Sequence, residues 1–234
     1  MPGPGRWAGR IAGLLVLLLG LVAGLGLLVT RVLENTAPLS DEDAVDRSLE
    51  AARTPAATAV SGFFSLVGST GVIIGVMVVV AVVFRLVFRR WRESAYLVLA
   101  VSAQSLVFLL VTLLVARDRP DVTKLDRSPP TSSFPSGHTG ASTALYVGIA
   151  VVLAWHTRHT WARRSVISAL VLVPLSVALA RLYRGMHHPS DVVVAFVNGS
   201  ACVAISARNL LFGVLPDSVA RRLDGSGSQA AATS

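Results

Sequence analysis

The chain has few charged residues for its length: 15% of its 234 residues are Asp, Glu, Lys or Arg, while 53% are hydrophobic and the mean hydropathy is +0.65. A soluble globular protein of this size seldom has this composition, which predicts a membrane protein that crosses the bilayer several times. A net charge of +8 would suggest a nucleic-acid ligand in a soluble chain. Here the arginines stand in short segments between apolar runs, a pattern that favours a role in membrane topology over nucleic-acid binding.

Cysteine is nearly absent too. The single Cys202 lies in an apolar run, which excludes an intrachain disulfide and a cysteine-based metal cluster. The sequence shows no internal repeat. Histidine is also scarce, since the whole chain has five, so two adjacent histidines in one short polar segment are the first indication of a functional site.

Six apolar runs are long enough to cross a bilayer, which takes about 20 residues per helix. The run at 11–32 is too long for a typical signal-peptide core, and no convincing cleavage site follows it, so we expect it to be retained as the first helix. The predicted fold class is therefore all-α: a polytopic membrane protein with a bundle of six transmembrane helices. These helices are expected near 11–32, 60–84, 95–116, 138–155, 165–183 and 191–213.

The arginines predict the orientation of the bundle, because positively charged loops stay in the cytoplasm. In a six-helix layout one side receives Arg6, Arg10, Arg85, Arg89, Arg90, Arg92, Arg158, Arg163, Arg164, Arg221 and Arg222. We therefore expect a cytoplasmic N-terminus over 1–10, a membrane domain over 11–213 and a disordered cytoplasmic tail over 214–234. The other side receives an outer loop at 33–59 and two further loops at 117–138 and 181–191. The outer loop at 33–59 is acidic, with Glu34, Asp41, Glu42, Asp43, Asp46 and Glu50.

Residues 181–191 read RLYRGMHHPSD and combine arginine, histidine and aspartate. If a helix begins near Pro189, His187 and Asp191 are four residues apart and can lie near one face. The carboxylate would then fix one imidazole nitrogen as a donor and leave the other free to attack an electrophile. The alternative is a polar loop between helices whose histidines cap a helix and face water.

Two other polar segments lie at the ends of apolar runs. In residues 135–138, PSGH, a proline suits the start of a helix, and the next three residues offer a hydroxyl, a backbone N–H and an imidazole at its positive end. Such a helix start is a phosphate-binding site, although an ordinary N-cap would look the same. In residues 117–120, RDRP, the arginines either reach toward the membrane surface or bind phosphate oxygens.

The order of the helices brings these segments together. RDRP follows the third helix, PSGH precedes the fourth, and residues 181–191 join the fifth and sixth, so six spans place all three at one face. Arg181 supports a site there, because a charge within a membrane helix needs a partner, and an anionic substrate would be one.

These three segments resemble the signature of the type 2 phosphatidic acid phosphatase (PAP2) superfamily, written KxxxxxxRP, PSGH and SRxxxxxHxxxD. Arg119 and Pro120 match the first part, residues 135–138 match the second, and the third is matched by Arg181, His187 and Asp191. The chain departs from the pattern twice: Thr112 replaces the lysine, and Ala180 replaces the serine before the arginine. We expect Arg117 to supply the cationic phosphate contact that Thr112 cannot.

The resemblance implies a bacterial membrane phosphatase that needs no metal or other cofactor and works through a phosphohistidine. It assigns His187 as nucleophile, Asp191 as its orienting carboxylate and His138 as general acid and base. The phosphate-binding residues would be Arg119, Arg181, Ser136, Gly137 and, by our hypothesis, Arg117. A site facing outward at the cell membrane favours a lipid phosphate or diphosphate, such as undecaprenyl diphosphate, phosphatidic acid or phosphatidylglycerol phosphate. No nucleic acid and no obligatory protein partner is expected.

Three alternatives remain open at this point. Thr112 and Ala180 could mark a catalytically degenerate member that binds lipid phosphates. The enzyme could instead transfer the phosphoryl group to an alcohol. A metal site made of His138, His187, His188 and Asp191 is chemically possible, but a cation site would not be lined with fixed positive charge such as Arg119.

Overall fold

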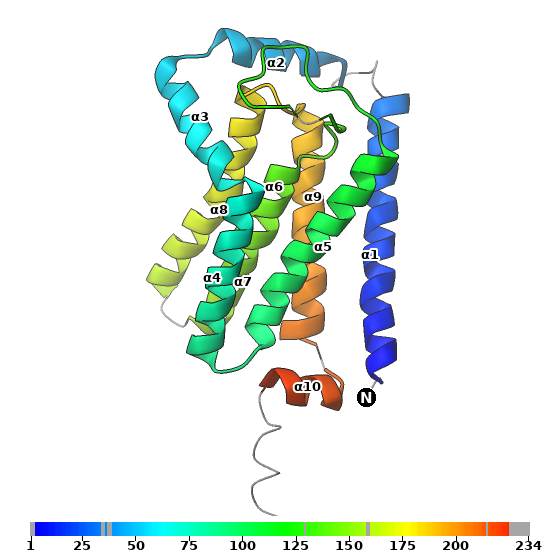
Figure 1. The fold of residues 1–234 in the computed structure, drawn as a ribbon, viewed down its shortest axis with the longest axis vertical. Helices are drawn as coiled ribbons and strands as arrows, with labels where there is room; N and C mark the ends of the chain where they lie inside the picture. Colours follow the sequence, from blue (N-terminus) through cyan, green and yellow to red (C-terminus); the bar gives the residue numbers. More distant parts are fainter. Residues whose placement is uncertain are drawn as a thin grey trace, which may run out of the picture.

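The computed structural model of the chain describes residues 3–33, 36, 39–128, 130–157, 160–213 and 215–224. Within these ranges every regular element is a helix (Figure 1), which confirms the all-α prediction. Six helical segments are long and apolar enough to cross a membrane, as predicted. They run over Pro4–Val32, Thr70–Phe88, Arg92–Leu114, Gly137–His156, Arg163–Tyr183 and Pro189–Leu211.

The helices follow one another in this order: α1 (Pro4–Leu27), α2 (Glu42–Ala51), α3 (Pro55–Val67), α4 (Thr70–Phe88), α5 (Arg92–Leu114), α6 (Gly137–Ser142), α7 (Gly148–His156), α8 (Thr160–Tyr183), α9 (Pro189–Ser206) and α10 (Asp217–Asp224). A single π-helical segment, Thr143–Val147, joins α6 to α7, so the two form one continuous span. Glu34 and Arg158, both used in the topology prediction, lie outside the described residues.

The second span begins later than the apolar run predicts. Residues 60–84 were expected to form one helix, but residues 55–67 form the separate helix α3, and α4 starts at Thr70. Thr54 begins α3 by accepting a hydrogen bond from the Ala57 backbone N–H at 3.2 Å, with Pro55 in the first turn. Gly68 and Ser69 then separate the two helices. The segment 33–59 is therefore largely helical and carries all of α2.

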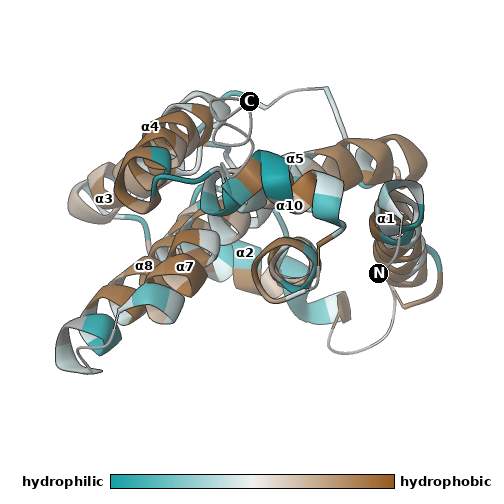
Figure 2. Ribbon diagram, turned by 90° about the horizontal axis from the view of Figure 1, so that it is seen from below, coloured by the Kyte–Doolittle hydropathy of each residue, from teal (hydrophilic) through white to brown (hydrophobic). Residues whose placement is uncertain are grey.

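The expected disorder of 214–234 is wrong for its first part, where residues 217–224 form α10. The helix has one apolar side, and Val219, Ala220 and Leu223 pack against the main hydrophobic core. Its end is held by the Trp91 backbone N–H, which donates to the Leu223 carbonyl at 2.6 Å. Figure 2 shows α10 lying across the end of the bundle. Residues 225–234 lie outside the described residues.

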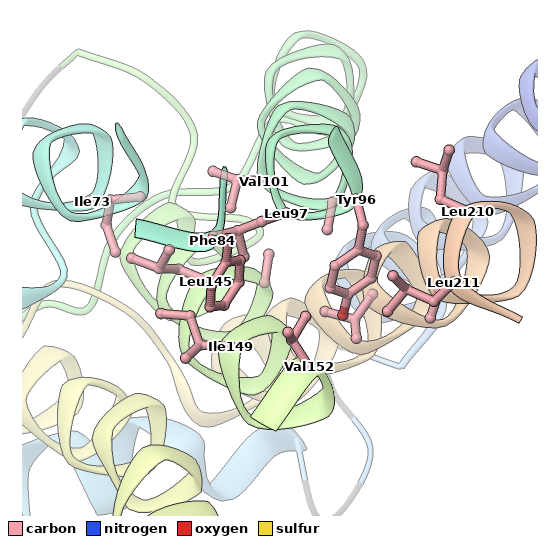
Figure 3. Packing of buried hydrophobic residues seen from close by; sticks show 14 of the residues in the cluster. Ile73, Phe84, Tyr96, Leu97, Val101, Leu145, Ile149, Val152, Leu210 and Leu211 are labelled. Carbon is pink, nitrogen blue, oxygen red and sulfur yellow. The ribbon is translucent and has the colours of Figure 1, made fainter. Parts of the chain in front are cut away.

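The main core lies toward the α10 end of the bundle, between α4, α5, α7 and the end of α9 (Figure 3). Tyr96, Leu97, Leu145 and Val152 are fully buried there, so these helices are held together by apolar contacts. The outer faces are apolar as well, with Leu17, Leu86 and Leu113 exposed, as expected for helices that contact lipid. The opposite end of the bundle is thus left for polar side chains.

A close approach of α6 and α9 depends on a glycine. A Cβ added to Gly199 would lie 2.7 Å from the Gly140 carbonyl oxygen and 2.7 Å from the Thr143 Cβ.

We expect Gly199→Ala to lower the free energy of unfolding by about 1–3 kcal/mol, because the helices must separate. Thermal unfolding in detergent measures this. Gly20→Ala is the matched control, because its added Cβ meets nothing within 4 Å. Equal midpoints for the two variants would contradict the prediction.

Candidate active site

The three polar segments meet at the end of the bundle that carries α2, opposite the N-terminus and α10 (Figure 1). Hydrogen bonds to backbone carbonyls hold them together. The Ser136 N–H donates to the Asp191 carbonyl at 3.1 Å, which joins the start of α6 to the start of α9. Arg119 Nη1 donates to the Met186 carbonyl at 2.7 Å, which joins the loop after α5 to the turn before α9. The order of the spans therefore gathers the motifs as the sequence predicts.

A cavity of about 730 Å³ lies among these segments. Its polar part is lined by Arg119, Gly137, His138, Arg181 and His187, which are five of the eight predicted site residues. Asp191, Arg117 and Ser136 are not among its lining residues. A pocket of this volume is in the range that holds small ligands or a lipid headgroup with part of its chain.

His187 has a defined tautomer. Its Nδ1 lies 2.7 Å from the Ser133 carbonyl oxygen, and because a carbonyl can only accept, Nδ1 carries the proton. Nε2 then keeps its lone pair. Burial lowers the pKa of His187; the Asp191 carboxylate opposes this, the charges of Arg181 and Arg119 add to it, and the net lowering favours the neutral ring.

Asp191 does not hold His187 in the way the spacing predicts. Its Oδ2 lies 3.7 Å from Nδ1 of His187, too far for a hydrogen bond, and accepts instead from the His188 backbone N–H at 2.9 Å. The helix start at Pro189 explains this, because a carboxylate in the first turn turns back to the free N–H groups there. Asp191 therefore acts on His187 through its charge, while the Ser133 carbonyl fixes the ring.

Arg117 lies behind Asp191, not in the cavity with His187. Its guanidinium forms an ion pair with Asp191 Oδ1 and donates to Glu42 Oε2 and Ser190 Oγ, each at 2.7 Å. The guanidinium group of Arg117, which we expected to contact phosphate, is thus paired with the carboxylates of Asp191 and Glu42. Arg117 lines two neighbouring cavities instead. Thr112 takes no part either, since its hydroxyl donates to the Phe108 carbonyl of its own helix at 2.9 Å.

Arg119 and Arg181 both line the cavity and both have spare donor capacity. Arg181 Nη1 donates to Asp126 Oδ2 at 2.6 Å and to Ser65 Oγ at 2.7 Å. The Nε atoms of Arg119 and Arg181 are buried and have no hydrogen-bond partner among the described residues. Buried arginine donors without partners are unusual and costly.

Asp126 is a site residue that the motifs do not reveal. It bridges two arginines, accepting from Arg181 and, at 2.7 Å, from Arg184 Nη2. Burial alone would raise its pKa, but the hydrogen bonds from Arg184 and Ser65 and the charge of Arg181 lower the pKa of Asp126 to about 2. Asp126 is therefore ionised at neutral pH and holds both guanidinium groups in place. Its neighbour Arg127 is exposed and lines the same cavity.

The start of α6 divides its polar groups between two roles. His138 and Gly137 line the cavity, and a Cβ on Gly137 would lie 2.8 Å from the Phe108 ring, so a glycine allows this close approach. Ser136 is buried and caps the helix: its Oγ accepts from the Thr139 N–H at 3.5 Å and lies 3.0 Å from Thr139 Oγ1. The structure thus gives the Ser136 hydroxyl a capping contact and does not bring it to the cavity.

Comparison with known proteins agrees with this architecture. The fold and the site define a multi-pass helical membrane protein with an arginine- and histidine-lined cavity. Residues 93–212, more than half of the chain, match the model of the PAP2 superfamily, and the chain belongs to that superfamily. No curated protein sequence matches the chain significantly.

Two solved structures are similar to the chain. One is described as the first transmembrane PAP2 type phosphatidylglycerolphosphate phosphatase from Bacillus subtilis, with a TM-score of 0.70, 21% identity, and coverage of 82% of this chain and 92% of that one. The other is Aquifex aeolicus LpxE, with a TM-score of 0.57, 25% identity, and coverage of 70% and 93%. The six-helix arrangement is therefore that of PAP2 membrane proteins.

Proposed function

We propose that the protein is a membrane phosphatase that hydrolyses a lipid phosphate or diphosphate through a phosphohistidine. One observation carries this proposal: Arg119 and Arg181, each with a buried Nε–H that has no partner among the described residues, line the same cavity as His187, whose Nε2 keeps its lone pair. A phosphate that satisfied both arginines would sit beside a neutral nucleophile. Positioning and charge stabilisation of this kind supply most of the catalysis in phosphoryl transfer.

The proposed reaction has two displacements. His187 Nε2 attacks phosphorus, and the bond from phosphorus to the lipid oxygen breaks while His138 donates a proton to that oxygen. His138 then takes a proton from water, whose oxygen attacks the phosphohistidine and releases phosphate and free His187. Asp191 stabilises the cationic ring of the intermediate, and the Gly137 N–H can contribute to the phosphate oxygens together with Arg119 and Arg181.

The cavity walls support a lipid substrate. Away from the histidines the cavity is lined by Ile73 and Ile74 of α4 and by Phe108 and Leu109 of α5. Ile74 is 50% exposed and Leu109 is 53% exposed, so the apolar part of the cavity reaches the outer, lipid-facing surface of the bundle. An acyl or isoprenyl chain can therefore extend between α4 and α5 while its phosphate lies at the arginines.

The positive-inside rule supports a site that faces outward. The end of the bundle opposite the cavity carries Arg6, Arg10, Arg85, Arg89, Arg90, Arg92, Arg163, Arg164, Arg221 and Arg222 among the described residues. We propose that this end is cytoplasmic, in a bacterial cell membrane. An outward site favours isoprenyl diphosphate, while the printed name of one similar structure favours phosphatidylglycerol phosphate.

Phosphate release in detergent tests the proposal. We expect release from at least one of undecaprenyl diphosphate, phosphatidic acid and phosphatidylglycerol phosphate, with a metal chelator present throughout. Glycerol phosphate, which lacks the chain, should have a kcat/KM at least about tenfold lower, because binding energy from the apolar wall is lost. If every lipid bound and none released phosphate, the chain would be a lipid-binding member without catalysis.

A further inference from the structure

A second cluster of polar side chains lies outside the proposed catalytic cavity, where α2 meets the turn before α9. Asp43 and Asp46 stand three residues apart on α2, and His188 follows the proposed nucleophile. His188 Nδ1 lies 3.0 Å from Asp46 Oδ2 and 4.0 Å from Asp43 Oδ1. One ligand atom from each of the three residues lies within 4.8 Å of the others, a spacing that lets all three coordinate one ion.

The carboxylate of Asp46 carries an unused acceptor. Asp46 is only 2% exposed, yet its Oδ1 has no hydrogen-bond partner among the described residues. A buried carboxylate oxygen without a partner is costly, and the neighbouring carboxylates of Asp43 and Glu42 add to the negative charge around it. The Glu42 oxygens are occupied by Arg117 and Ser190, so Glu42 supplies charge and not a free ligand atom.

An ion can reach the cluster from solution. A cavity of about 660 Å³ borders it and is lined by Asp43 and His188, together with Asp118 and Asp121. Arg31, Arg117 and Arg119 also line this cavity, but Arg117 is paired with Asp191 and Glu42, and the carboxylates of Asp43, Asp118 and Asp121 outnumber the two remaining arginines. The Asp43 side chain is 59% exposed, so it can exchange bound water with an arriving cation.

We propose that Asp43, Asp46 and His188 bind one divalent cation that fastens α2 to the turn bearing His187. One imidazole nitrogen with two carboxylates suits Zn²⁺ better than Mg²⁺ or Ca²⁺, and three protein ligands leave a position for water. The ion takes no part in the displacement at phosphorus. It positions the turn, because the backbone N–H of the ligand His188 holds the carboxylate of Asp191.

Zinc binding to tag-free protein tests the proposal. The protein is stripped with chelator in detergent, and Zn²⁺ is titrated against a chromogenic competitor. We expect one ion per chain, and an affinity at least about tenfold lower in Asp43→Asn and in Asp46→Asn. Asp41→Asn is the matched control: it removes the same charge from an exposed residue just before α2, outside the cluster. Its affinity should equal that of the native protein.

Thermal unfolding gives a second readout that does not depend on activity. At a hundredfold excess of Zn²⁺ over Kd we expect the native midpoint to rise by about 5 °C or more, and the Asp43→Asn midpoint to stay unchanged. Because Asp43 is exposed, its replacement is not expected to disturb folding. Asp46 is buried, so its replacement can change stability by itself, and the thermal test therefore uses Asp43→Asn. Absence of Zn²⁺ binding to the native chain, or equal binding by Asp43→Asn, would overturn the proposal. Zn²⁺ binding and the shift of the midpoint need no turnover, so they test the zinc proposal whether or not the protein releases phosphate.

Discussion

Replacing His187 with alanine is expected to lower phosphate release from the lipid substrate by at least about 10⁴-fold, because the attacking atom is removed. The cavity keeps Arg119 and Arg181 in this variant, so lipid binding should change little. Initial rates and binding of the same lipid to the two proteins measure these effects. His156→Gln is the matched control: His156 lies at the far end of α7, where its Nε2 is 3.1 Å from Glu93 Oε1, and glutamine can keep that contact.

The intermediate can be trapped by separating the two roles of His138. An aryl phosphate has a leaving group that needs no proton, so His138→Ala should still form the phosphohistidine but hydrolyse it slowly for lack of a base. Labelled phosphate that is acid-labile and base-stable should then accumulate on the His138→Ala protein and be absent from the double variant that also carries His187→Ala. Labelling of the double variant would show that another side chain is the nucleophile.

Arg117→Ala is expected to lower the free energy of unfolding by about 3–5 kcal/mol, because it leaves the fully buried Asp191 carboxylate without its ion-pair partner. Since Arg117 does not line the cavity of His187, kcat should fall by about 100-fold while KM stays the same. Chemical denaturation and steady-state kinetics measure the two effects. Arg117→Lys should recover only part of each, because an ammonium group lacks the planar fork that reaches Asp191 and Glu42 together.

The kinetic result separates two roles for this arginine. A higher KM with an unchanged kcat would show that Arg117 binds phosphate, as expected if it replaces the lysine that is absent at position 112. Arg31→Ala is the control, because Arg31 is an exposed arginine on the wall of a cavity that Arg117 also lines. Both kinetic constants should be unaffected by that change.

Hydropathy predicts the six spans well because a bilayer demands about 20 apolar residues in each, whatever their packing. It does not predict where a helix is interrupted inside an apolar region. The run at 60–84 reads as one helix, yet Gly68 and Ser69 end α3 and begin α4. Likewise, 217–224 is too short and polar to predict a helix, and it forms one because Leu223 and its neighbours find an apolar surface on the core.

The same distinction applies to the site. His138, His187, Arg119 and Arg181 could be placed in one cavity because they stand in short segments whose side of the membrane follows from counting spans. The partner of Arg117 could not be predicted, because Glu42 lies 75 residues away in the sequence, on a helix whose packing no local pattern reveals. Asp126 is equally hidden: nothing nearby in the sequence indicates that it pairs with Arg181 and Arg184.

The bridge from Glu42 through Arg117 to Asp191 also bears on how the protein is made. It joins three segments that emerge from the ribosome at widely separated times, and the last of them contains both His187 and Asp191. A nascent chain that has inserted α1 through α8 holds Arg119 and Arg181 but lacks His187. Under the proposed function, hydrolysis becomes possible only when α9 and the turn before it have entered the membrane. Incomplete chains would then carry the phosphate-binding arginines without the residue proposed to attack phosphorus.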